Sequence, residues 1–175
     1  MKVVSSVCDF LGINISLSPD SRLNFSLGSN STIHFLNNKY RFKDNPTNVL
    51  AFSYVNFKNP IGIENIYQFI ENNNASFTDN SDLEFLSDNI ISKKSYISYI
   101  FSNSKNIILP NDILGDIIIS YEKTIDEAND LKISPIERFS FLVLHGVLHI
   151  LGYDHINDSD ADLMEFVEKT IIKNL

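Results

Sequence analysis

Three of the four histidines in this 175-residue chain, His145, His149 and His155, lie within eleven residues. The first two are four residues apart, so on a helix they project from the same side, one turn apart. Gly152 can adopt the left-handed conformation that ends a helix, which lets the chain turn back and bring His155 to the same point. Three neutral imidazoles with an open fourth position are the ligands of a catalytic zinc ion rather than a closed structural one. The spacing therefore predicts one metal ion bound by these three side chains, with Zn²⁺ preferred, although nickel and copper also bind nitrogen ligands well.

The residue after the first histidine indicates which reactions this site can catalyse. The spacing is that of the long zinc-peptidase motif H-E-x-x-H-x-x-G-x-x-H, whose glutamate accepts a proton from the metal-activated water. This chain has Gly146 in that position, and glycine has no group that can accept a proton. Phosphodiester cleavage is therefore favoured over peptide hydrolysis, because the metal and a neutralised phosphate can supply most of its catalysis. A zinc peptidase or other amide hydrolase stays an alternative.

Other polar residues give weaker signals. Asp154 adjoins a metal ligand, and two interpretations of it remain open: it orients an imidazole or accepts a proton, or it only caps a turn. Tyr153 is interpreted as a packing residue. His34 is far away in the sequence and is interpreted as an ordinary surface or packing residue.

A buried helix is predicted to carry the first two histidines. Residues 134–137 form a capping box with proline at the first helical position, which predicts a helix from there to about residue 151. Its side chains are mostly apolar, so it should be a rigid central element, as a catalytic site requires. Residues 157–160 cap a final amphipathic helix, whose predicted inward-facing residues are Leu163, Phe166, Val167 and Ile171.

The remaining elements are predicted from apolar patterns and turn residues. Strands are expected at 12–17, 22–27, 49–54 and 115–121, with a turn at 19–21. Helices are expected at 32–40, capped within 29–31 and with Ile33, Leu36 and Tyr40 on one side, and at 122–131. The long stretch 56–108 is rich in Asn and Ser and is interpreted as an insertion or subdomain with short helices near 63–72 and 82–91.

Composition indicates a globular protein of one domain. Hydrophobic residues make up 43% of the chain, the mean hydropathy is −0.04, and no apolar run is long enough to span a bilayer. The single cysteine, Cys8, cannot form an internal disulfide, and the N-terminus does not resemble a secretory signal, so a cytoplasmic location is expected. The net charge of −8 argues against general affinity for nucleic acids. A nucleic-acid enzyme would therefore have to concentrate its cations around one groove.

Three segments of the chain resemble the YbeY family of bacterial endoribonucleases and rRNA maturation factors. Residues 145–155 resemble the family signature H-G-x-L-H-x-x-G-Y-D-H, including Gly146. Residues 36–52 are similar to its segment L-N-x-x-Y-R-x-K-D-x-P-T-[DN]-V-L-S-F, with Ala51 in place of the usual serine. Residues 114–120 are similar to its strand L-G-D-I-x-I-S. The three segments occur in the family's order.

The resemblance implies a zinc-dependent, single-strand-specific endoribonuclease that acts in rRNA processing, particularly 3′-end maturation of small-subunit rRNA, and in ribosome quality control. Its implied partners are single-stranded RNA or precursor rRNA and the small ribosomal subunit with its proteins. It also implies an α+β fold (mixed α/β): a small, mostly mixed sheet packed against helices, with a central metal-bearing helix. Residues 1–175 would form a single metal-dependent hydrolase domain, with 56–108 as a probable insertion within it.

Arg41 corresponds to the family's arginine that faces the metal groove. It lies with Lys39 and Lys43 in the one locally basic segment of an acidic chain. A guanidinium can hold a phosphate through two parallel hydrogen bonds. We therefore predict Arg41 as a catalytic residue.

A non-enzymatic alternative is a ribosome assembly factor with a structural metal. The negative net charge suits this alternative, because docking could proceed through basic ribosomal proteins rather than bare RNA. The oligomeric state stays open.

Overall fold

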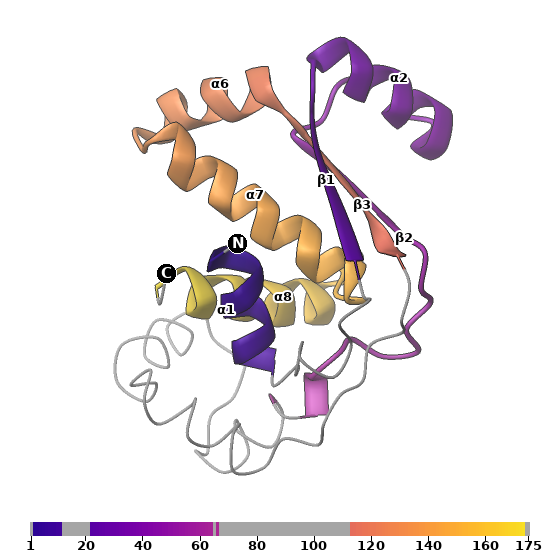
Figure 1. Cartoon of the computed structure of the whole chain (residues 1–175), viewed down its shortest axis with the longest axis vertical. Coiled ribbons are helices and arrows are strands. Elements are labelled where there is room, and N and C mark those ends of the chain that lie inside the picture. Colours follow the sequence, from indigo (N-terminus) through magenta and orange to yellow (C-terminus); the bar gives the residue numbers. More distant parts are fainter. Residues whose placement is uncertain (1, 12–21, 65, 67–112, 174–175) are drawn as a thin grey trace.

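The computed structural model describes residues 2–11, 22–64, 66 and 113–173 of the chain (Figure 1). Within them, helices and strands follow in the order α1 (Lys2–Leu11), β1 (Arg22–Gly28), α2 (Asn30–Arg41), β2 (Val49–Ser53), β3 (Ile113–Ser120), α6 (Tyr121–Leu131), α7 (Pro135–Ile150) and α8 (Asp158–Ile172). The predicted strand at 12–17, its turn at 19–21 and the predicted helix at 82–91 lie outside the described residues, as does most of the one predicted at 63–72. No helix of the described part is long and apolar enough to cross a membrane.

The three strands form one mixed sheet in the order β1-β3-β2, which confirms the expected α+β class. β1 is parallel to the central strand β3, and β2 is antiparallel to it, with Val49 opposite Ile119 and Ser53 opposite Gly115. The side chains of Ile117 and Ile119 are buried, as the β-branched run predicts. Because β3 lies between the other two strands, β2 is an edge strand of the described sheet.

Helix α7 lies between the sheet and the helices α1 and α8 (Figure 1). Several of its apolar side chains are fully buried and form the centre of the core together with the isoleucines of β3: Leu142, Leu144, Leu148 and Ile150. Each such side chain stabilises the fold by roughly 1.5–3 kcal/mol relative to exposure. The helix is central to the packing, as its apolar sequence predicts.

Both ends of α7 follow the sequence signals. The Ser134 hydroxyl accepts a hydrogen bond from the Glu137 N–H at 3.2 Å, and the Glu137 carboxylate accepts one from the Ser134 N–H at 2.7 Å. The Ser134 N–H, and after it the Ser134 hydroxyl, lower the pKa of the Glu137 carboxylate by hydrogen bonding to it. At the other end Gly152 has φ of +94°, its N–H donates to the carbonyl of His149 at 3.1 Å, and the Tyr153 N–H donates to that of Leu148 at 3.0 Å. This pair of bonds is the Schellman motif, which directs the chain back after the helix.

The N-terminal helix α1 was not predicted. It has no acidic residue in its first turn and no basic residue in its last, and its β-branched valines favour strands. Val7 and Leu11 are nonetheless fully buried, and the helix contacts α7 and α8. Burial raises the pKa of Cys8 to about 11, so this thiol stays protonated. Tertiary contacts therefore stabilise a helix that the local sequence does not specify.

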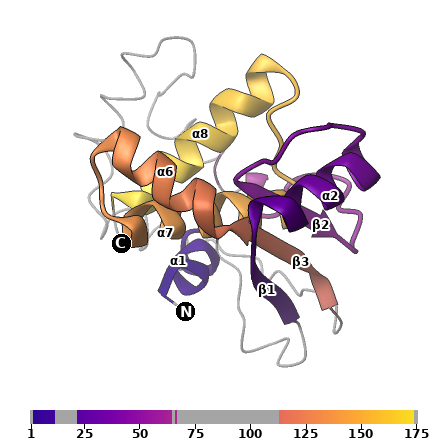
Figure 2. The same cartoon turned by 90° about the horizontal axis from the view of Figure 1, so that it is seen from above.

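Helix α2 lies at the end of the sheet where β1 ends and β2 begins (Figures 1 and 2). Its N-cap is Ser29, within the predicted capping segment. Ile33 is buried as expected, but Tyr40 is 54% exposed and packs its ring edge on Phe52, with 5.3 Å between ring centroids. Tyr40, at the last turn of α2, therefore contacts the rim of the sheet and is not part of the core.

Gly146 allows α7 to approach β3 closely. A Cβ atom at this position would lie only 2.8 Å from Cγ2 of Ile117. Any side chain at position 146 would therefore require Ile117 or the helix to move.

We expect overpacking in Gly146→Ala to lower the free energy of unfolding by about 1–3 kcal/mol. The better helix propensity of alanine offsets up to ~1 kcal/mol of this loss. Urea unfolding of the two single variants and the double variant with Ile117→Ala measures the coupling. The double variant should be more stable than the sum of the single effects predicts. Additivity within about 0.5 kcal/mol would contradict this explanation of the glycine.

Candidate metal centre

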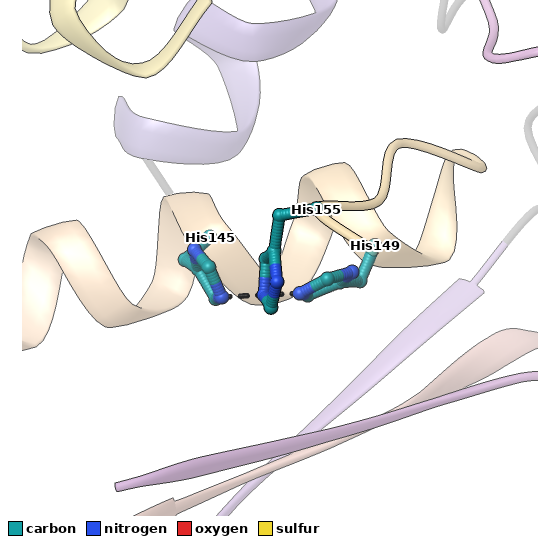
Figure 3. A group of neighbouring side chains, drawn as sticks. All are labelled: His145, His149 and His155. Carbon is teal, nitrogen blue, oxygen red and sulfur yellow. Dashed lines mark hydrogen bonds between the residues drawn. The ribbon is translucent and has the colours of Figure 1, made fainter. Parts of the chain in front are cut away.

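The three histidine rings converge beside the C-terminal half of α7 (Figure 3). His145 and His149 lie one turn apart on the helix, and His155 returns to them on the loop that follows Gly152 (Figure 3). The Nε2 atoms of His145 and His149 are 3.0 Å apart, and one nitrogen of each of the three rings lies within 4.8 Å of the others. Two nitrogens bound to the same tetrahedral zinc ion are roughly 3.3 Å apart. The three side chains could therefore hold a single metal ion.

Hydrogen bonds at the far side of two rings set their orientation. His149 Nδ1 lies 3.0 Å from the carbonyl oxygen of Tyr153, which can only accept, so Nδ1 donates and Nε2 keeps its lone pair. His145 Nδ1 donates in the same way to the carboxylate of Glu168 at 2.6 Å. Both lone pairs consequently point to the space between the rings, where a metal ion needs them.

Glu168 is a site residue that the sequence analysis missed. It lies on α8, is only 8% exposed, and bonds His145 from the opposite side to the other histidines. Carboxylates of this kind fix the tautomer of a metal-binding histidine and raise its basicity. The available signal was its spacing: Met164, Glu168 and Ile171 share the buried face of α8, where an acidic residue is unusual unless it is paired.

Burial keeps His149 in the form that binds metals. Desolvation, followed by the nearby charges of His145 and His155, lowers the pKa of His149 from 6.5 to about 4. Its imidazole is therefore neutral at pH 7 without any metal bound. No proton has to be displaced from this ring when a metal binds.

Asp154 and Tyr153 support the loop that carries His155. The Asp154 carboxylate accepts the His155 N–H at 2.8 Å and lies 4.0 Å from His149 Nδ1, which already donates to a carbonyl. This geometry favours the turn-capping interpretation of Asp154. Tyr153 is buried, and its hydroxyl donates to the carbonyl of Ile61 at 2.9 Å, in keeping with its predicted packing role.

A groove of about 850 Å³ adjoins the histidines. Its lining includes all three rings, the β2 residues Val49, Ala51 and Ser53, and the basic residues Arg41 and Lys43. The structure thus brings all four residues predicted for the site to one groove, although Arg41 is exposed and its role stays a prediction.

Lys39 of the basic segment and His34, the fourth histidine, do not line the groove. The Nζ atom of Lys39 lies over the rings of Tyr40 and Phe35, 5.0 and 5.8 Å from their centroids. His34 bonds the carboxylate of Asp44 at 2.7 Å and is 43% exposed, which confirms that it is a surface residue.

The whole chain is similar in sequence to a known protein family. Residues 1–175 match the sequence profile of the family described as Endoribonuclease YbeY. A protein of that name from Syntrophomonas wolfei is 27% identical, over 98% of this chain and 83% of that protein. Others from Agathobacter rectalis and Colwellia psychrerythraea are 30% and 31% identical, over 89% and 92% of this chain and 76% and 74% of theirs. A Thermotoga maritima protein solved in solution overlaps 98% of this chain and 77% of its own, with 17% identity and a TM-score of 0.47.

His149 should make the metal-free protein less stable in acid. Its folded pKa of about 4 is below the 6.5 of an unperturbed histidine, so between these values the unfolded chain binds a proton that the folded chain does not. The free energy of unfolding therefore falls as the pH decreases through this window, by roughly 3 kcal/mol for the full shift.

Urea unfolding with chelator present, at neutral pH and at about pH 4, tests this for the wild type and His149→Gln. The variant should lose less stability than the wild type over the same range. Equal losses in the two proteins would remove His149 as the cause.

We expect Glu168→Ala to weaken the binding of Zn²⁺ by about 10- to 100-fold, because His145 loses the partner that orients it. Competition with a coloured chelator measures this affinity. Glu165→Ala is the matched control, since Glu165 lies on the same helix but is half-exposed and pairs with Lys169 at 2.7 Å. An equal effect of the two substitutions would show that Glu168 does not act through His145.

Proposed function

Since this chain belongs to the YbeY family of endoribonucleases, we propose that it cleaves single-stranded RNA with a zinc ion held by His145, His149 and His155. The observation that carries this proposal is the convergence of three imidazole nitrogens at a groove that also contains a guanidinium. The three rings line a groove of about 850 Å³, whereas a closed structural site would have four protein ligands.

The donor set supports zinc as the metal. Three neutral imidazoles suit Zn²⁺, and the described residues within reach include no cysteine that would complete a closed site. When bound, the ion would polarise a phosphate oxygen and activate a water molecule for attack on phosphorus. The protein's contribution is to orient the rings of His145 and His149 through their hydrogen-bond partners, and to keep His149 neutral by burial.

Arg41 is proposed to bind the scissile phosphate. It lines the groove with the histidines, and its planar guanidinium can donate two parallel hydrogen bonds to phosphate oxygens. The charge that develops on these oxygens during cleavage would be offset by the same group. Lys43 adds a second positive charge to the groove lining. An acidic protein would thus present RNA with a locally basic surface.

The groove is poorly suited to peptide hydrolysis. The position of the peptidase glutamate is occupied by Gly146, which packs against Ile117 of the sheet, so this glycine is required by the fold. Among the described residues that line the groove, Asp154 is the one carboxylate, and it caps the His155 turn. Phosphodiester cleavage requires less from a protein base, because neutralisation of the phosphate supplies much of the catalysis.

The proposed setting is ribosomal RNA processing, particularly maturation of the 3′ end of small-subunit rRNA, and ribosome quality control in the cytoplasm. The resemblance of residues 36–52, 114–120 and 145–155 to the family segments supports it. The net charge of −8 suits contacts with basic ribosomal proteins of the small subunit outside the groove. The match over 1–175 supports a single domain. The insertion at 56–108 is proposed from the length and composition of that stretch alone.

We expect Arg41→Ala to reduce kcat/KM for cleavage of single-stranded RNA by about 10²- to 10³-fold, because phosphate charge is left without its partner. Zinc content should stay at one ion per chain, since Arg41 is not one of the three side chains that could hold the metal. Arg22→Ala is the control, because Arg22 is exposed on β1 and does not line the groove. If Arg41→Ala cleaves RNA as fast as Arg22→Ala does, Arg41 has no catalytic role and a non-catalytic assembly function gains support.

A further inference from the structure

Phe42, which lies in the chain between two residues that line the groove, combines two unfavourable features. Its side chain is 91% exposed, the largest exposed fraction among the described large hydrophobic residues. Its φ of +57° places it in the left-handed region, which side chains other than glycine and asparagine rarely occupy. The position ends α2, with the Phe42 N–H donating to the Asn38 carbonyl at 3.0 Å. Glycine would close the helix with less strain, so packing and capping do not explain a phenylalanine here.

The residues on either side of Phe42 in the chain indicate which kind of ligand this ring can bind. Arg41 and Lys43, on either side of it, both line the groove that contains the three histidines. A strand that places phosphates on these two cations spans the chain position of Phe42, whose exposed side chain is not itself part of the groove lining. An exposed aromatic ring between two cations is the combination that binds single-stranded nucleic acid, with phosphates on the charges and a base on the ring.

The other aromatic rings on α2 already have partners. Lys39 lies over the rings of Phe35 and Tyr40, and Tyr40 also packs against Phe52. These contacts leave the ring of Phe42 as the α2 aromatic whose faces are most open to a ligand.

We propose that Phe42 is a stacking platform for one unpaired base of the RNA substrate, next to the phosphates bound by Arg41 and Lys43. This inference rests on the proposed function and adds a contact that selects for single strands. A base in a duplex is stacked on its neighbours and is not free to cover the ring. The preference for unpaired RNA would thus arise partly from one side chain outside the histidine cluster.

Cleavage kinetics with a single-stranded oligoribonucleotide test the platform in the zinc-loaded protein. We expect Phe42→Ala to raise KM by about 5- to 100-fold, the usual effect of losing one stacked base, and to change kcat little. Phe42→Trp should retain the low KM, whereas Phe42→Leu, which keeps an apolar side chain without a ring, should not. On an RNA whose bases have been removed, wild type and Phe42→Ala should have the same KM.

A glycine pair separates the ring from the backbone strain. Phe42→Gly should raise Tm by about 2–4 °C, because glycine adopts the left-handed conformation without strain, and should still raise KM. Lys132→Gly is the matched control: Lys132 ends α6 with φ of +56°, and it precedes α7 at the end away from the histidines. It should stabilise the protein similarly and leave KM unchanged.

The outcomes distinguish this inference from the proposed function. If the wild type cleaves single-stranded RNA and Phe42→Ala has the same KM, the platform is overturned and the proposed function stands. If Phe42→Ala raises KM equally on base-free RNA, the ring contacts something other than a base and the platform is again overturned. If the wild type itself does not cleave single-stranded RNA, the proposed function fails and the platform fails with it.

Discussion

The close approach of α7 to β3 is the constraint on which the rest of the structure depends. It requires that no side chain stands between the helix and Ile117, and Gly146 meets that requirement. The same helix supplies the centre of the core and, one residue before the glycine, the first histidine. The histidine pair is therefore fixed by core packing, which resists small displacements. The backbone of the site thus gains its rigidity from the apolar interior, and polar contacts then orient the rings.

The loop after α7 extends this rigidity to the third histidine. Gly152 reverses the chain, the Tyr153 side chain is buried, and the Tyr153 carbonyl orients His149. A single turn thus ends the helix, returns His155 to the cluster and fixes the tautomer of another ring. From the far side Glu168 fixes His145, so two of the three imidazoles are aligned before a metal binds.

The parts that could be predicted from the sequence are those determined by neighbouring residues. The capping box at 134–137, the end of α7 at Gly152 and the isoleucines of β3 depend on local preferences, and the structure has each of them as expected. Helix α1 and the role of Glu168 depend on contacts between segments far apart in the chain, which the linear pattern does not contain. The left-handed conformation of Phe42 was also missed, because phenylalanine is not a residue that signals such a cap.

The pairing of β2 with β3 affects how far the connection between these two strands can change in length without disturbing the sheet. The strands are antiparallel neighbours, with Ser53 opposite Gly115, so the polypeptide leaves the sheet and re-enters it at almost the same place. Each doubling of such a connection adds only about 0.6 kcal/mol of closure entropy. Residues can therefore be gained or lost between these strands during evolution with little effect on the sheet. The residues directly after Ser53 are different, because Phe57 lines the histidine groove and Ile61 bonds the loop that carries His155, so a foreign sequence grafted there would disturb the site.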